Sequence, residues 1–192
     1  FIASSAASDV YKRQERLWIL ANTDPLTGAL NRRRFLELLE GDARKPGGKP
    51  ATLAVLMLDL DYFKMINDRF GHSTGDEALR HFTELAKAEL RDRDHFARLG
   101  GEEFAALLPG TKLEAALVVA ERIRARTADA GFADENGVPV PLSVSIGVTD
   151  LPANDRRPLA VLNRADKALY LTKKSGRNRV AKATIDRPPE LV

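Results

Sequence analysis

The sequence predicts an α+β domain with a ferredoxin-like β-α-β-β-α-β core, in which helices pack on a mostly antiparallel sheet. Three observations predict this fold class. A continuous apolar run at 52–58 is typical of a buried strand. Two further segments, 96–99 and 104–108, flank the pair Gly100-Gly101 and indicate a hairpin. Apolar residues at helical spacing lie between these strands and after them.

Helices are expected on both sides of the buried strand in the first half of the chain. Residues 31–43 carry apolar side chains three and four positions apart, which predicts an amphipathic helix. Residues 63–70 indicate a short helix that ends at Gly71. Apolar positions between 79 and 90 then share one face of a longer helix.

The second half of the chain repeats the pattern of helix, strand and helix. Apolar positions over 113–123 predict an amphipathic helix. Residues 142–148 alternate between apolar and small residues, as a half-buried strand does. A last helix is expected over 159–169, with Gly176 as its C-terminal cap, and residues 179–183 are expected to add a short edge strand.

Length and composition exclude several classes of protein. The 192 residues, 44% hydrophobic and 30% charged, are enough for one domain with a real core. A net charge of +3 is too small to indicate nucleic-acid binding. The absence of cysteine excludes disulfides, thiolate zinc sites and a cysteine nucleophile, and the three histidines do not fall at zinc-ligand spacing.

No apolar run approaches the roughly 20 residues of a membrane span. We therefore expect a cytoplasmic domain with no membrane contact and no nucleic-acid partner of its own. A membrane anchor upstream in the full-length protein is left open.

The chain divides into four segments. Residues 1–14 lack a clear period and are expected to be a non-native or disordered leader. Residues 15–22 indicate the end of an upstream signalling helix, whose sensory domain is missing from this sequence. Residues 23–183 form the predicted catalytic domain, and residues 184–192 are expected to be a loose C-terminal tail.

Acidic residues follow both the buried strand and the glycine pair. Asp59 ends the apolar run, and Asp61 would lie on the same side of a continued strand. Glu102 and Glu103 follow the glycines and should point to opposite faces, which suggests different roles. The predicted topology brings these acids to one end of the sheet. Oxygen ligands without soft donors fit Mg²⁺ or Mn²⁺.

A nucleoside triphosphate is the natural partner of such a metal site, because Mg²⁺ usually keeps phosphate and water in its shell. The sequence has no P-loop motif, so Lys173 and Arg177, near the end of the last helix, are the candidate phosphate partners. Taken singly, these features are ordinary, since a glycine hairpin with acids is usually a solvated turn and an Asp at a strand end is often a cap. Their joint occurrence on one fold indicates a functional site.

Several ordered segments between about Thr23 and Val180 carry a family resemblance. They are DPLTGALNR at 24–32, DLDYFKMIND at 59–68 with FGHSTGD at 70–76, GGEEF at 100–104, SVSIGV at 143–148, and ADKALY at 165–170 with KKSGRN at 173–178. This set resembles the motifs of GGDEF domains, the diguanylate cyclases. The fold that the resemblance implies is the nucleotide-cyclase, palm-like form of the predicted core.

The resemblance implies that two GTP molecules are joined into cyclic di-GMP, with release of two pyrophosphates, by an antiparallel homodimer. It implies two Mg²⁺ or Mn²⁺ ions per active site, held by Asp59, the Leu60 carbonyl and Glu102. Glu102 or Glu103 would help to deprotonate the attacking 3′-hydroxyl, and this choice stays open. Lys64, Lys173 and Arg177 would meet the phosphates and the growing charge. The other implied substrate-binding residues are Asn67 and Asp76 on guanine, His72 beside the substrate, and Gly100 and Gly101.

A product-inhibition site is also implied by the resemblance. Arg91 and Asp94 match the family's R-x-x-D site at the expected distance before Gly100, and Arg122 stands where a second inhibitory arginine is often found. The guanidinium fork of arginine suits phosphate and guanine edges. The competing interpretation is a charged helix end with ordinary surface ion pairs.

Three alternative functions are kept. The first is a catalytically weak or inactive receptor of the same fold that binds cyclic di-GMP or GTP. The second is a polymerase-like palm that acts on nucleic acid, which the low aromatic content of 6% and the absence of a basic stripe disfavour. The third is a dimerisation module, which would leave the acid cluster unexplained.

Overall fold

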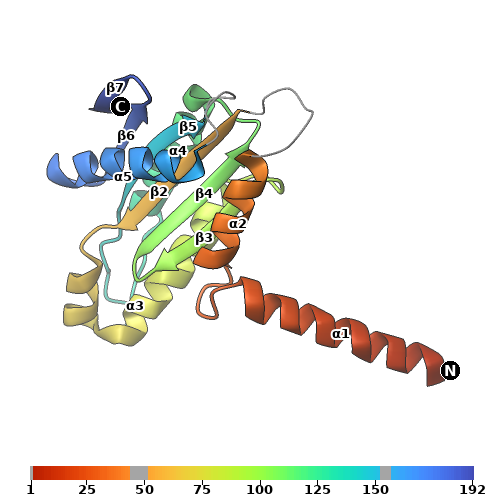
Figure 1. Cartoon of the computed structure of the whole chain (residues 1–192). Coiled ribbons are helices and arrows are strands. Elements are labelled where there is room, and N and C mark those ends of the chain that lie inside the picture. Colours follow the sequence, from red (N-terminus) through yellow and green to blue (C-terminus); the bar gives the residue numbers. More distant parts are fainter. Residues whose placement is uncertain (1, 44–51, 152–156) are drawn as a thin grey trace.

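The computed structural model describes residues 2–43, 52–151 and 157–192, and within these ranges one seven-stranded sheet runs through the domain (Figure 1). The strands are β1 (Leu30–Asn31), β2 (Leu53–Leu60), β3 (His95–Gly100), β4 (Glu103–Pro109), β5 (Val144–Leu151), β6 (Val180–Thr184) and β7 (Arg187–Leu191). The helices are α1 (Ile2–Asn22), α2 (Arg32–Ala43), α3 (Phe63–Ala88), α4 (Leu113–Asp129) and α5 (Pro158–Lys174).

The predicted ferredoxin-like core is confirmed. The strand order is β1-β3-β4-β2-β5-β6-β7, and its four middle members β3, β4, β2 and β5 pair antiparallel throughout. They are the four strands of the unit β2-α3-β3-β4-α4-β5. Only β1 on β3 and β5 on β6 pair in parallel, so the sheet of the described residues is mostly antiparallel.

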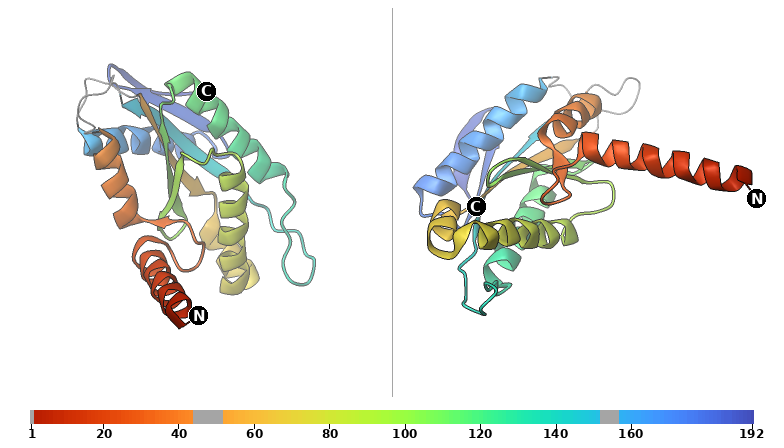
Figure 2. Two further views of the ribbon diagram at one scale, coloured as in Figure 1. Left: turned by 90° about the vertical axis from the view of Figure 1, so that its right-hand side faces the viewer. Right: turned by 90° about the horizontal axis from the view of Figure 1, so that it is seen from below.

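Helices cover both faces of the sheet (Figure 2). One core cluster joins α3 and α4 to side chains such as Leu56, Phe104 and Ile146. A second cluster joins α2 and α5 to the opposite face, with Val55 and Ala105 among its members. Because successive residues of a strand point to opposite faces, the four middle strands β3, β4, β2 and β5 contribute to both cores.

Strand β2 lies in the middle of the sheet, and all eight of its residues are buried. This position explains the continuous apolar run in the sequence, since a strand covered on both faces has no solvent side to alternate with. The run ends where β2 reaches Asp59, whose carboxylate is therefore held at the edge of the core.

Helix α3 is bent at Gly71, whose φ of 87° and ψ of 161° are not helical. The sequence predicts two helices separated at this glycine, and the structure has two helical segments that meet there. The first segment leaves the end of β2, and the second packs against the sheet through Leu79 and Phe82, which are buried.

The two ends of the sheet differ from the prediction. Asn31, expected to begin a helix, instead forms the short strand β1 with Leu30, beside β3. The expected edge strand, β6, lies between β5 and β7, and the expected loose tail contains β7. Two prolines made this tail look unstructured, but an edge strand tolerates proline because one row of its backbone groups needs no partner.

Helix α1 points away from the rest of the domain (Figures 1 and 2). Its backbone is helical over Ile2–Asn22, a range that includes residues 2–14 of the predicted leader. Helix α1 ends at Asn22, the residue at which the sequence predicts the end of a helix. None of the helices in the described ranges is both long and apolar enough to cross a bilayer.

Candidate active site

The acids that follow β2 and those of the β3–β4 hairpin meet at one end of the sheet. Asp59 pairs directly with Glu103 across the β2–β4 ladder. The next backbone amide, that of Leu60, donates to the carbonyl of Glu102 at 3.2 Å. Facing residues of an antiparallel pair point to the same side, so Glu103 shares a face with Asp59. The convergence expected from the sequence is thus present.

Asp59 is only 6% exposed, and its Oδ2 lies 2.7 Å from the Lys173 Nζ. Burial raises the pKa of Asp59 to about 6; the hydrogen bond and charge of Lys173 act in the opposite direction, and the charges of Glu102 and Glu103 raise it further. Two carboxylates and one ammonium group therefore act electrostatically on the Asp59 carboxylate.

The packing of α5 on β5 brings Lys173 to Asp59. A Cβ at Gly147 would overlap the Ala165 carbonyl and the Leu169 amide, so only glycine lets this helix lie so close to the sheet. Lys173 lies one turn after Leu169 on the same helix, and its Nζ donates to the Asp59 carboxylate at the end of β2. Gly147 of β5 thus helps to position Lys173, although the two residues are far apart in the sequence.

The donor set at this end of the sheet fits a hard cation, since it offers carboxylate and carbonyl oxygens and no soft ligand. The ion pair between Lys173 and Asp59 shows that a positively charged group can lie against this carboxylate. Within the described ranges, no three acidic or imidazole side chains converge to form a metal site by themselves. The remaining ligands of an ion would therefore have to come from a bound triphosphate, from water or from the backbone.

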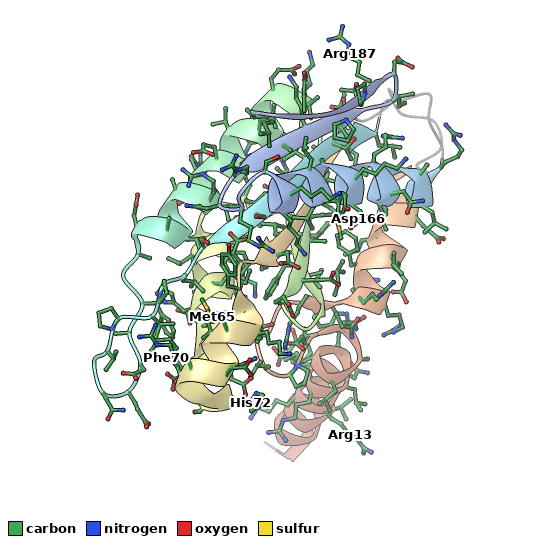
Figure 3. All side chains as sticks on the ribbon, turned by 90° about the vertical axis from the view of Figure 1, so that its left-hand side faces the viewer. Arg13, Met65, Phe70, His72, Asp166 and Arg187 are labelled. Carbon is green, nitrogen blue, oxygen red and sulfur yellow. The ribbon has the colours of Figure 1, made fainter. Side chains whose placement is uncertain are left out.

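The predicted substrate residues Lys64, Asn67, His72 and Asp76 lie along the first part of α3 and just past its bend. Lys64, His72 and Asp76 are exposed, and Asn67 is partly buried. Figure 3 shows His72 at the opposite end of the molecule from Arg187. No hydrogen bond or ion pair among the described residues joins these four side chains to the acids, and their link to the exit of β2 is the start of α3 at Phe63.

Arg177 reaches the same exit from the loop after α5. Its guanidinium carbon stands 4.5 Å from the centre of the Tyr62 ring, and its Nη1 donates to the tyrosine hydroxyl at 3.4 Å. Both residues have positive φ, 65° for Arg177 and 55° for Tyr62. A cation–π contact of this kind aligns the guanidinium with the segment that follows Asp59. No pattern in the sequence indicated this role for Tyr62.

Asp61 has a supporting role that the sequence did not reveal. Its carboxylate accepts hydrogen bonds from the Ser143 hydroxyl at 2.8 Å, the Ser145 hydroxyl at 2.7 Å and the Asn178 amide at 2.9 Å. The side chain is buried, with 3% exposed. Asp61 therefore fastens the loop that carries Arg177 to the exit of β2. The spacing of two residues from Asp59 was the one available signal.

Arg98 is a second residue that sequence reasoning missed. Its Nε donates to the Gly101 carbonyl at 2.9 Å, and its Nη1 lies 3.2 Å from the Asp24 carboxylate. Burial alone would raise the pKa of Asp24, but hydrogen bonds from Thr27 and the nearby Arg98 lower it overall. The arginine thus ties the glycine turn, where Gly101 has a φ of 54°, to the segment after α1.

The predicted product-inhibition residues separate into two groups. Arg91 and Asp94 share one turn, in which the Arg91 amide donates to Asp94 Oδ2 at 2.9 Å, and both line a hollow of about 410 Å³. Arg122 does not line this hollow. Its guanidinium donates hydrogen bonds to the Glu89 carboxylate at 2.7 Å and to the Glu89 backbone carbonyl at 3.0 Å.

Comparisons with known proteins agree with this architecture. The profile of the family described as diguanylate cyclase, GGDEF domain, matches residues 21–179. Diguanylate cyclase DgcP of Pseudomonas aeruginosa is 42% identical over 160 residues, which are 83% of this chain and 24% of that protein. The response regulator PleD of Caulobacter vibrioides is 42% identical over 164 residues, 84% of this chain and 36% of that protein. The chain thus spans less than half the length of these curated relatives.

Solved structures give the same result. The coiled coil and GGDEF domain of DgcB from Caulobacter crescentus, in complex with c-di-GMP, superposes with a TM-score of 0.86 at 28% identity, covering 94% of this chain and 95% of that one. The active GGEEF domain of a diguanylate cyclase from Vibrio cholerae gives 0.74 at 34% identity, covering 80% and 96%. With the profile match, the shared fold and the acids gathered at the glycine hairpin, the chain belongs to the GGDEF family of diguanylate cyclase domains.

Proposed function

We propose that this domain is an active diguanylate cyclase, which joins two GTP molecules into cyclic di-GMP and releases two pyrophosphates. The observation that carries the proposal is the group at the end of β2, where buried Asp59 interacts with Glu102, Glu103 and Lys173. An acid-rich group with a lysine suits phosphoryl transfer, which depends mainly on positioning and charge neutralisation.

Asp59, the Leu60 carbonyl and Glu102 would hold two Mg²⁺ or Mn²⁺ ions, and Glu103, which pairs with Asp59 in the β2–β4 register, would be a further candidate ligand. When bound, the ions would offset the charge of the triphosphate and acidify the attacking 3′-hydroxyl. Glu102 or Glu103 would accept the hydroxyl proton. The 3′-oxygen would then form its bond to the α-phosphorus of the facing GTP as the bond to pyrophosphate breaks.

The remaining residues would bind and orient the nucleotide. Lys173 and Arg177 carry positive charge to the exit of β2 and, with Lys64, would meet the phosphates. Gly100 and Gly101 lack a Cβ and would let the backbone approach the triphosphate. Asn67 and Asp76 would bind the guanine edge, with His72 beside it. A pocket of this kind rejects adenine, because its own polar groups would stay unpaired.

The working form would be an antiparallel homodimer, because one domain presents one such site and the ring product needs two facing GTP molecules. Helix α1 projects from the domain and would connect it to an upstream sensory region that controls the pairing (Figure 1).

Incubation of the full chain with GTP and Mg²⁺, with chromatography of the products, tests this proposal. We expect cyclic di-GMP and two pyrophosphates per product, with a specific activity that rises with protein concentration because the productive encounter joins two copies. Binding of GTP or cyclic di-GMP without turnover at every concentration would favour the receptor instead. Omitting the divalent cation is the control.

We further propose that the product inhibits the enzyme at Arg91 and Asp94. Their shared turn and the adjoining hollow support this site. The change Arg91→Ala is expected to remove most binding of cyclic di-GMP, because the guanidinium is the phosphate and base donor. Isothermal titration calorimetry measures this loss, with Arg93→Ala, an exposed neighbour, as the matched control. Equal affinity of the Arg91 variant and the parent would exclude the site.

A further inference from the structure

The hollow beside Arg91 and Asp94 is bounded on one side by a residue from outside the catalytic core. Its lining includes Trp18 of α1, together with Lys87, Leu90 and His95. Trp18 is 51% exposed, so half of its surface is free of contacts with the described part of the chain. The Trp18 indole, two cationic side chains and the two aspartates Asp92 and Asp94 thus line one space of about 410 Å³.

Helix α1 is fastened so that Trp18 stays at this hollow. The Ala21 carbonyl accepts hydrogen bonds from Asn31 Nδ2 at 2.9 Å and from the Arg33 guanidinium at 2.5 Å. Leu30, next to Asn31, pairs with Ala97 of β3, three residues after Asp94. The last turn of α1 and the turn that holds Asp94 are therefore attached to neighbouring strands.

The polar groups of the hollow suit a guanine nucleotide. Asp94 Oδ2 accepts the Arg91 amide, whereas its buried Oδ1 has no hydrogen-bond partner among the described residues and can accept from a guanine N–H. The Lys87 Nζ donates a hydrogen bond to the Gly28 carbonyl at 3.1 Å, and Lys87 thereby adds a second positive charge to the lining of the hollow. What Arg91 and Asp94 do not supply is a flat apolar surface for the base.

We infer that Trp18 completes the Arg91–Asp94 site by stacking on a guanine base of bound cyclic di-GMP, so that the product joins the base of α1 to the catalytic domain. The inference rests on the proposed product-inhibition site and adds a contact from α1. Bases stack readily on aromatic side chains, and such contacts contribute substantially to affinity. Product binding would then fix the direction in which α1 leaves the domain.

The chain supplies its own reporter, because Trp18 is its only tryptophan. Titration of the full chain with cyclic di-GMP is expected to quench tryptophan fluorescence, and Arg91→Ala should abolish the quenching. By calorimetry, Trp18→Ala is expected to weaken binding about tenfold, and Trp18→Phe less. Leu20→Ala is the matched control, since Leu20 is 76% exposed on the same helix and does not line the hollow.

The outcomes separate this inference from the proposal beneath it. Unchanged affinity of Trp18→Ala, with binding lost in Arg91→Ala, would overturn the role of Trp18 and leave the product site standing. Unchanged affinity in both variants would overturn the product site and the inference together. If Trp18→Ala alters only the monomer–dimer equilibrium in sedimentation, the tryptophan contacts a second copy and the inference is wrong.

Discussion

Replacing Glu102 with alanine is expected to lower turnover of GTP to cyclic di-GMP by about 100- to 1000-fold or more. In the proposed mechanism this carboxylate binds a divalent ion and is one of two candidates for the proton acceptor. Its loss would weaken the proposed metal site beside the buried Asp59. Initial rates at saturating GTP and Mg²⁺ measure the effect, and Glu84→Ala, an exposed glutamate of α3, is the matched control.

The fold should survive this change, because the contact that Glu102 makes to β2 comes from its backbone. The Leu60 amide donates to the carbonyl of residue 102, which alanine retains. Circular dichroism and thermal unfolding are expected to match those of the parent. Full activity in a folded Glu102→Ala protein would contradict the metal-binding role, whereas an unfolded variant would show that the side chain is needed for structure.

The change Asp61→Ala is expected to destabilise the domain by about 3 kcal/mol or more. It removes an acceptor of three hydrogen bonds and leaves the hydroxyl of Ser145 and the amide of Asn178 without their acceptor. Each bond to a charged acceptor is typically worth about 1.5–3 kcal/mol, and the three are not additive. Urea denaturation measures the free energy of unfolding.

Two comparisons make the Asp61 result specific. Asp186→Ala removes an exposed carboxylate from the β6–β7 turn and should change stability by less than about 0.5 kcal/mol. Asp61→Asn retains one acceptor oxygen and should fall between the alanine variant and the parent. If Asp61→Ala costs no more than the Asp186 control, the hydrogen bonds to Ser143, Ser145 and Asn178 do not hold the loop after α5 in place.

Local patterns were sufficient for the central part of the fold. The apolar run of β2 and the glycine-centred hairpin predicted the two elements that meet at the candidate active site, and the structure joins them by the Asp59–Glu103 register. Burial on both faces leaves a continuous apolar signal, and a glycine pair between two apolar runs marks a turn. At the sheet edges the signal was weak, since β1 has two residues and β7 contains Pro188 and Pro189.

By itself, the sequence determined the core elements, the candidate acids and the family resemblance, because each depends on residues that are close together in the chain. Only the tertiary structure decided which side chains support those acids. Asp61 meets Ser145 across 84 positions, and Arg98 meets Asp24 across 74. Such pairs leave no periodic trace, since their geometry follows from how strands align. The same holds for Trp18, whose place beside Arg91 depends on the parallel pairing of β1 with β3.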